Sequence, residues 1–122
     1  SGRFLGVTDR LLPNYIHPDR VGDPALVNAI KAMALDVGQD GFVRQQTAVI
    51  GRADNRRDLG DIECPTLILV GRQDVLTPLA RHEEMHAAIA TSNLCVIEDC
   101  GHLSTLERPE AVNQAMRDWL KT

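Results

Sequence analysis

The sequence predicts an α/β protein in which two parallel strands alternate with helices after a helical segment. Residues 1–58 show helical patterns and no clear strand, whereas from about Asp61 short apolar runs alternate with amphipathic stretches. The runs Thr66–Val70 and Leu94–Ile97 are short and aliphatic, which is typical of strands buried on both faces. The order strand–helix–strand–helix implies a right-handed crossover between parallel strands.

The helical segment contains one clear start signal. Asp23 supplies an N-cap and Pro24 a first helical residue, and apolar residues then recur at helical spacing, Met33 and Val37 among them, until Gly38. The other predicted elements are a helix over residues 1–12, a loop over 14–22, and helices over 40–50, 78–90 and 109–121.

Composition narrows the possible classes of function. The 122 residues suit one small domain, and a formal net charge of −4 argues against a nucleic-acid surface. No apolar run approaches the ~20 residues that span a bilayer. The odd set Cys64, Cys95 and Cys100 has no repeating spacing, which favours reduced thiols. We therefore expect a cytoplasmic protein with neither nucleic-acid nor membrane partners, and we expect no cofactor or metal.

Two residues stand where active-site loops begin. Asp74 follows the first predicted strand and His102 follows the second. Reactive loops of such sheets lie beyond the carboxyl ends of the strands, so the topology brings this pair together. A carboxylate bonded to one ring nitrogen fixes the tautomer of a histidine that acts as a general base. The alternative is structural, with Asp74 capping the turn that follows it and His102 capping its own loop.

These stretches resemble the C-terminal part of the α/β-hydrolase superfamily over about residues 58–121. The matching stretches are Ile62–Asp74, Thr77-Pro78, Glu98–Leu103 and Glu107–Glu110 followed by an amphipathic helix. The resemblance implies that Asp74 is the acid and His102 the base of a catalytic triad. It also implies a helical cap, or lid, over residues 1–58 and the β-α-β-α part of the core over 59–122. Substrate-binding residues are expected at Leu76, Thr77, Leu103 and the first cap helix.

The superfamily's nucleophile motif is missing from this sequence. The order nucleophile, acid, histidine places a Gly-x-Ser-x-Gly elbow upstream, and no such motif occurs here. Ser92 and Ser104 lack the paired glycines. We therefore expect the C-terminal fragment of a hydrolase, acting on an ester, lactone or similar acyl substrate in the intact protein and inactive alone.

A zinc hydrolase is one alternative. His82-Glu83-Glu84-Met85-His86 matches the His-Glu-x-x-His motif on a predicted helix, where both imidazoles could reach one metal. A third ligand is also required, and none of the downstream candidates Glu98, His102 and Glu107 has a supporting pattern. The two histidines share a stripe with Leu79 and Ile89, so packing also explains them. The set Cys95, Cys100 and His102 fits no standard metal or redox spacing.

A non-catalytic binding or assembly module is the other alternative. A two-stranded parallel sheet leaves both edges with unpaired backbone groups and cannot cover its own faces. The run Thr66–Val70 carries no polar protection of its edge. We therefore expect a homodimer that pairs strands or exchanges helices.

Overall fold

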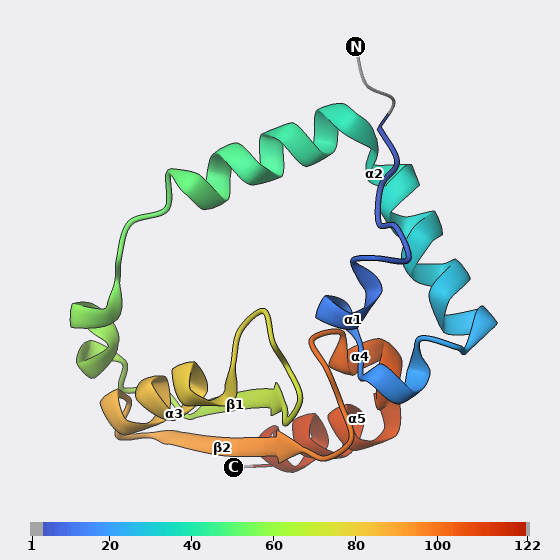
Figure 1. Ribbon diagram of the computed structural model, residues 1–122. Helices are drawn as coiled ribbons and strands as arrows, with labels where there is room; N and C mark the ends of the chain where they lie inside the picture. Colours follow the sequence, from blue (N-terminus) through green and yellow to red (C-terminus); the bar gives the residue numbers. More distant parts are fainter. Residues whose placement is uncertain (1–3, 122) are drawn as a thin grey trace.

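The computed structural model describes residues 4–121 and confirms the α/β architecture (Figure 1). The elements in chain order are α1 (Leu12–Tyr15), the 3₁₀ helix η1 (Pro18–Arg20), α2 (Pro24–Ile50), the 3₁₀ helix η2 (Arg56–Asp61), β1 (Thr66–Gly71), α3 (Leu79–Ala88), β2 (Ser92–Ile97), α4 (Ser104–Glu107) and α5 (Pro109–Trp119). The strands β1 and β2 pair in parallel, with Thr66 opposite Ser92 and Gly71 opposite Ile97. Both α3 and α5 contact the two strands. The carboxyl ends of β1 and β2 therefore lie side by side.

The long helix α2 starts and bends where the sequence indicates. The Asp23 side chain accepts hydrogen bonds from the backbone N–H groups of Ala25 and Leu26, at 3.0 and 3.2 Å. Gly38 has φ 68° and ψ 177°, a conformation outside the helical region that glycine adopts without a steric penalty. The two predicted helices thus run on from one another with a sharp bend, and α2 forms an arch over the strands (Figure 1).

The prediction of a helix over residues 1–12 was wrong for the described part. Residues 4–11 form turns and irregular structure, and residues 1–3 lie outside the described range. Gly6 takes φ 63°, which a helix does not accommodate, and Pro13 is accepted only in a first helical turn. Helix α1 therefore begins at Leu12. The predicted loop 14–22 instead holds the end of α1 and the 3₁₀ helix η1.

The buried apolar residues form two small clusters. Leu12, Ile16 and Ile30 make the first, with Leu103 packed against it. The second cluster joins Val112 of α5 to the end of β2, and its members are Ile97, Cys100 and Val112. Each cluster joins segments far apart in sequence. The first attaches the helical segment to the loop after β2, and the second attaches α5 to the sheet.

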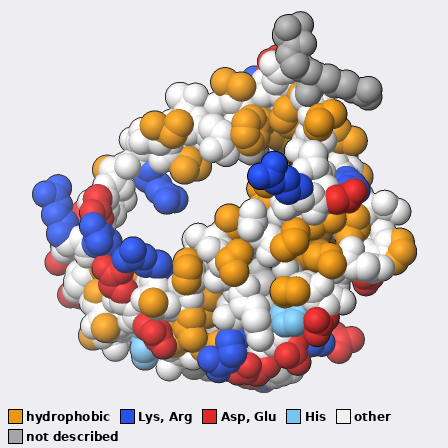
Figure 2. All heavy atoms as spheres, in the orientation of Figure 1, with side chains coloured by type: hydrophobic (Ala, Val, Ile, Leu, Met, Phe, Trp, Pro, Cys, Tyr) orange, Lys and Arg blue, Asp and Glu red, His pale blue; other side chains and the backbone are white. Residues whose placement is uncertain are grey.

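Much of α2 carries exposed apolar side chains. Met33 and Val37, which the helical pattern assigns to the core, are 46% and 43% exposed, and Ile50 is 83% exposed. Figure 2 shows an opening through the molecule beneath the arch of α2, with hydrophobic side chains around its rim. The pattern thus identifies an apolar face that the described residues cover only in part, for example where Phe4 packs on Phe42 with ring centroids 5.8 Å apart. None of the helices within residues 4–121 is long and apolar enough to cross a membrane.

Two glycines allow the backbones to approach closely beyond the strand ends. A Cβ atom on Gly71 would collide with the backbone carbonyl oxygens of Cys100 and Gly101. A Cβ atom on Gly101 would lie 2.7 Å from the backbone carbon of Ile16 and 2.8 Å from the backbone nitrogen of His17. These neighbours are backbone atoms and cannot rotate away. Three segments therefore meet at van der Waals distance at this edge of the sheet.

We expect the substitutions Gly71→Ala and Gly101→Ala each to lower the free energy of unfolding by about 1–3 kcal/mol, the usual cost of overpacking against atoms that cannot move away. Gly22→Ala is the matched control, because a Cβ atom there meets nothing within 4 Å. Chemical denaturation of the three variants measures the difference. A Gly101→Ala protein as stable as Gly22→Ala would contradict the close approach.

Candidate active site

The loop after β1 is built around Asp74. The backbone N–H of Asp74 donates to the Gly71 carbonyl at 3.1 Å, which closes a turn directly after the strand. The neighbouring Gln73 joins this loop to the next one. Its N–H donates to the Cys100 carbonyl at 2.9 Å, and its side-chain Oε1 accepts the Cys100 N–H at 3.0 Å. No sequence pattern indicates this role of Gln73, because its partner is 27 residues away.

Asp74 and His102 form a hydrogen bond. The Asp74 Oδ2 atom lies 2.8 Å from Nδ1 of His102. An ionised carboxylate can only accept, so Nδ1 carries the proton and Nε2 of the neutral ring keeps a free lone pair. The Asp74 side chain is 5% exposed and that of His102 is 33% exposed. The pair therefore has a buried acidic end and an accessible basic end, which is the arrangement that a general base requires.

Asp74 also caps the turn that follows it. Its Oδ1 atom accepts the backbone N–H groups of Leu76 and Thr77, each at 2.9 Å. The hydroxyl of Thr77 donates to Oδ2 at 2.8 Å and lies 3.3 Å from Nδ1 of His102. The turn cap that stood as the structural alternative is thus present together with the bond to histidine. Four donors fix the orientation of one carboxylate.

These contacts set the protonation state of Asp74. Burial by itself would raise the pKa of the Asp74 carboxyl. Hydrogen bonds from the Thr77 backbone, from His102 and from the Thr77 hydroxyl outweigh burial and hold the pKa below the ordinary value of 3.8. Asp74 is therefore ionised at neutral pH, and it can stabilise a positive charge on the imidazole of His102.

The three expected substrate-binding residues fall in different environments. Thr77 lies at the Asp74–His102 pair, and its hydroxyl is already used by Asp74. Leu76 is 44% exposed next to it. Leu103 packs on the cluster of Leu12, Ile16 and Ile30, and its N–H donates to the Tyr15 carbonyl at 2.9 Å. The loop after β2 thus brings Leu103 against the helical segment, and assignment of these residues to substrate stays a prediction.

The zinc motif lacks the surroundings of a metal site. The Nδ1 atom of His82 lies 3.3 Å from the Pro78 carbonyl, and that of His86 lies 2.8 Å from the Ser92 hydroxyl. Within residues 4–121, no group of three or more His, Cys, Asp or Glu side chains is placed to hold a metal ion. The pair of His86 and Ser92 is no catalytic dyad either. The Ser92 hydroxyl is buried, donates to the Ile89 carbonyl at 2.7 Å and lies at the start of β2, away from the reactive edge.

Cys100 stands close to the site but is a poor nucleophile. It is fully buried, and burial together with the nearby charge of Glu107 raises the pKa of its thiol to about 11. The thiolate that would attack a substrate is therefore nearly absent at neutral pH. Cys100 instead packs with Ile97 and Val112.

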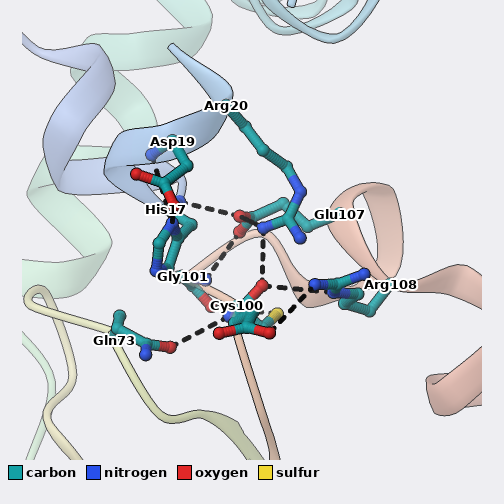
Figure 3. Close-up of polar contacts among 9 residues, drawn as sticks. His17, Asp19, Arg20, Gln73, Cys100, Gly101, Glu107 and Arg108 are labelled. Atoms are coloured by element: carbon teal, nitrogen blue, oxygen red, sulfur yellow. Dashed lines mark hydrogen bonds and ion pairs between the residues drawn. The ribbon is translucent and has the colours of Figure 1, made fainter.

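Glu107 is the residue whose importance the sequence did not reveal. Its side chain is completely buried, and it contacts two other segments, the loop at Gly101 and the segment of His17 and Arg20 (Figure 3). The sequence shows only an acidic residue before Arg108 and Pro109 at the end of the family-like stretch. Nothing in that pattern points to partners as far as 90 residues away.

Parallel strands whose carboxyl-end loops carry a hydrogen-bonded Asp and His are the arrangement of the α/β-hydrolase superfamily. Within this superfamily, residues 44–122 match the family described as TAP-like protein, and the chain belongs to that family.

Three similar proteins illustrate the relationship. A 2-hydroxy-6-oxononadienedioate/2-hydroxy-6-oxononatrienedioate hydrolase of Klebsiella pneumoniae is 39% identical over 51% of this chain and 22% of its own length. A pimeloyl-[acyl-carrier protein] methyl ester esterase of Neisseria meningitidis is 29% identical over 95% of this chain and 31% of its own length. A thermophilic esterase from Thermogutta terrifontis superposes with a TM-score of 0.87 and 32% identity, over 93% of this chain and 42% of the esterase. The chain thus spans less than half the length of each.

We expect the charge of Asp74 to make stability depend on acid pH. Because the folded-state pKa lies below 3.8, the carboxylate's contribution is complete above about pH 5 and is lost as pH falls through the lowered value. Urea unfolding from about pH 6 to pH 2.5 should show a steep loss in the wild type and a shallower one in Asp74→Asn.

Glu98→Gln is the control for this measurement. Its ion pair with Arg72 also lowers the pKa of Glu98, but both side chains are largely exposed and solvent screens their interaction. The slope of this variant should stay close to that of the wild type. Equal slopes in the wild type and Asp74→Asn would contradict a buried, ionised Asp74.

Proposed function

We propose that this chain supplies the acid and the base of an α/β-hydrolase that cleaves a small ester, lactone or similar acyl substrate. The observation that carries the proposal is the 2.8 Å bond between Asp74 and Nδ1 of His102, made by a buried acid and a partly exposed base. The family relationship supports the reaction class, and two of the similar proteins are esterases by name.

In the proposed reaction, each member of the pair has its own step. An upstream nucleophile, outside this chain, attacks the substrate carbonyl while Nε2 of His102 takes its proton. Asp74 stabilises the resulting imidazolium through Nδ1. The tetrahedral intermediate collapses, and Nε2 gives the proton to the leaving oxygen, which yields an acyl-enzyme. Water then attacks in the same way, with His102 again removing and returning one proton, and the acid product leaves.

The residues around the pair have separate roles in the proposed reaction. Thr77 stabilises the ionised Asp74 through its backbone and hydroxyl, as its two short bonds indicate. Leu76, on the exposed side of the same turn, and Leu103, against the helical segment, are proposed to border the substrate. Residues 1–58 would then act as the cap. These residues would form part of the wall of the substrate pocket.

Self-association of the chain also stays a prediction. The two strands form the whole sheet of the described residues, so each has one edge without a strand partner. The exposed apolar side chains of α2 add surface that favours association. A second copy of the chain or the remaining part of a hydrolase fold could cover these surfaces.

We expect the 122-residue chain alone to hydrolyse short-chain p-nitrophenyl esters no faster than buffer, because no nucleophile elbow is present in its sequence. Initial rates with and without the chain measure this. The variant His102→Ala serves as the control, and turnover that disappears in this variant would show a nucleophile within the chain.

In the intact hydrolase that contains this chain, we expect Asp74→Ala to lower kcat by about 10⁴-fold, the usual effect of losing the acid of such a relay. His102→Ala should lower it at least as much, because it removes the proton carrier. Asp118→Ala, on the exposed side of α5, is the control and should leave kcat unchanged. Unchanged turnover in Asp74→Ala would refute the assignment.

A further inference from the structure

A buried carboxylate lies behind the candidate site and takes no part in the proposed chemistry. The Glu107 side chain is 0% exposed, and both its oxygens are hydrogen-bonded. Oε1 accepts the His17 N–H at 2.7 Å and a guanidinium N–H of Arg20 at 3.2 Å. Oε2 accepts the Gly101 N–H at 2.9 Å. Figure 3 shows the carboxylate between the segment of His17 and Arg20 and the loop of Cys100 and Gly101.

The presence of a buried carboxylate at this position requires a physical explanation. Burying a carboxylate costs several kcal/mol of desolvation, and an apolar side chain of the same size is often equally stable at such a position. A carboxylate differs from an apolar residue in its directional acceptors. The two oxygens of Glu107 hold backbone groups from two separate segments in one orientation, which apolar packing does not do.

The first of these backbone groups lies directly before the candidate base. Gly101 precedes His102, and its N–H is fixed by Glu107. On the other side of His102, the N–H of Leu103 is fixed by the Tyr15 carbonyl at 2.9 Å. The peptide group directly after the histidine and the peptide group between Cys100 and Gly101, one residue before it, are therefore held. Glu107 holds the Gly101 N–H, and Tyr15 holds the Leu103 N–H. Tyr15 lies in the same helical segment as the residues that Glu107 binds.

The second segment cannot shift independently. Gly101 packs against the backbone of Ile16 and His17, and Arg20 also donates to the Asp99 carbonyl at 2.5 Å. Movement of residues 15–20 therefore displaces Glu107, and movement of Glu107 displaces Gly101. The contacts run in one connected chain from the helical segment to the backbone that carries the imidazole.

We propose that Glu107 is a positioning residue for His102. It holds the imidazole against Asp74 by fixing the Gly101 peptide, and it makes that position depend on residues 15–20. The effect of Glu107 on catalysis rests on the proposed function. Its effect on the hydrogen bond between His102 and Asp74 does not. It can therefore be tested without any activity.

The test is proton NMR of the chain labelled with ¹⁵N-histidine. The Nδ1–H proton of His102, held by a carboxylate, gives a signal far downfield of the amide region. In Glu107→Gln we expect this signal to broaden, move upfield or vanish, because one acceptor oxygen becomes an amide group that repels the Gly101 or His17 N–H. Circular dichroism should show unchanged helix content. A folded Glu107→Gln protein with an unchanged Nδ1–H signal would overturn the proposal.

Two further variants keep the result interpretable. Glu110→Gln makes the same chemical change three residues later on an exposed side chain, and its signal should match the wild type. Arg20→Met removes the charged partner but leaves the contact with Gly101, so we expect a smaller change in the same direction. If Glu107→Gln fails to fold, Arg20→Met decides, and an unchanged signal there also overturns the proposal.

Measurements of activity distinguish a failure of this inference from a failure of the proposed function. In the intact hydrolase, Glu107→Gln should lower kcat by about 10²-fold with little change in KM, as expected for a displaced catalytic group. An altered NMR signal with turnover insensitive to Asp74→Ala would support the positioning role and reject the hydrolase assignment. A full rate with an altered signal would show that the position of His102 is not used in catalysis.

Discussion

Three backbones approach one another closely beyond the strand ends, and the position of the candidate site follows from this contact. Parallel pairing in the register of Gly71 with Ile97 sends both chains out of the sheet side by side. Only glycine permits the next step, in which the two loops touch each other and the segment of Ile16. Asp74 and His102 then come within hydrogen-bonding distance without any further adjustment. The site is therefore a consequence of backbone packing, to which the side chains add orientation.

Two buried carboxylates stabilise this edge in different ways. Asp74 accepts hydrogen bonds from four donors, and one of them is Nδ1 of His102, whose imidazole ring is partly exposed to solvent. Glu107 receives only groups that are themselves fixed, and its side chain is sealed from water. A carboxylate that meets a partly exposed base can respond to a charge appearing on it, whereas a sealed one maintains a geometry. Burial and partners thus give the same functional group two different environments.

The pair of Asp74 and His102 could be predicted because strand topology alone places both residues at one edge. The bend at Gly38 and the cap at Asp23 were predictable for a similar reason, since each depends on local backbone preferences. Glu107 and Gln73 could not be found in this way. Their partners lie 90 and 27 residues away, and no spacing rule connects such positions. The failed helix over residues 4–11 shows the same limit, because apolar residues there pack against α2 and α1 without helical geometry.

The apolar pattern of α2 points to surfaces that the described residues do not complete. Its cap and bend follow the sequence, yet Met33, Val37 and Ile50 remain exposed. Hydrophobic side chains also surround the opening beneath the arch (Figure 2), and apolar surface gathered in this way favours contact with another surface. The Thermogutta terrifontis esterase has more than half its length outside the part that this chain matches. Contacts with another protein surface, rather than the intrinsic preferences of α2, would determine how the arch sits over the strands (Figure 1).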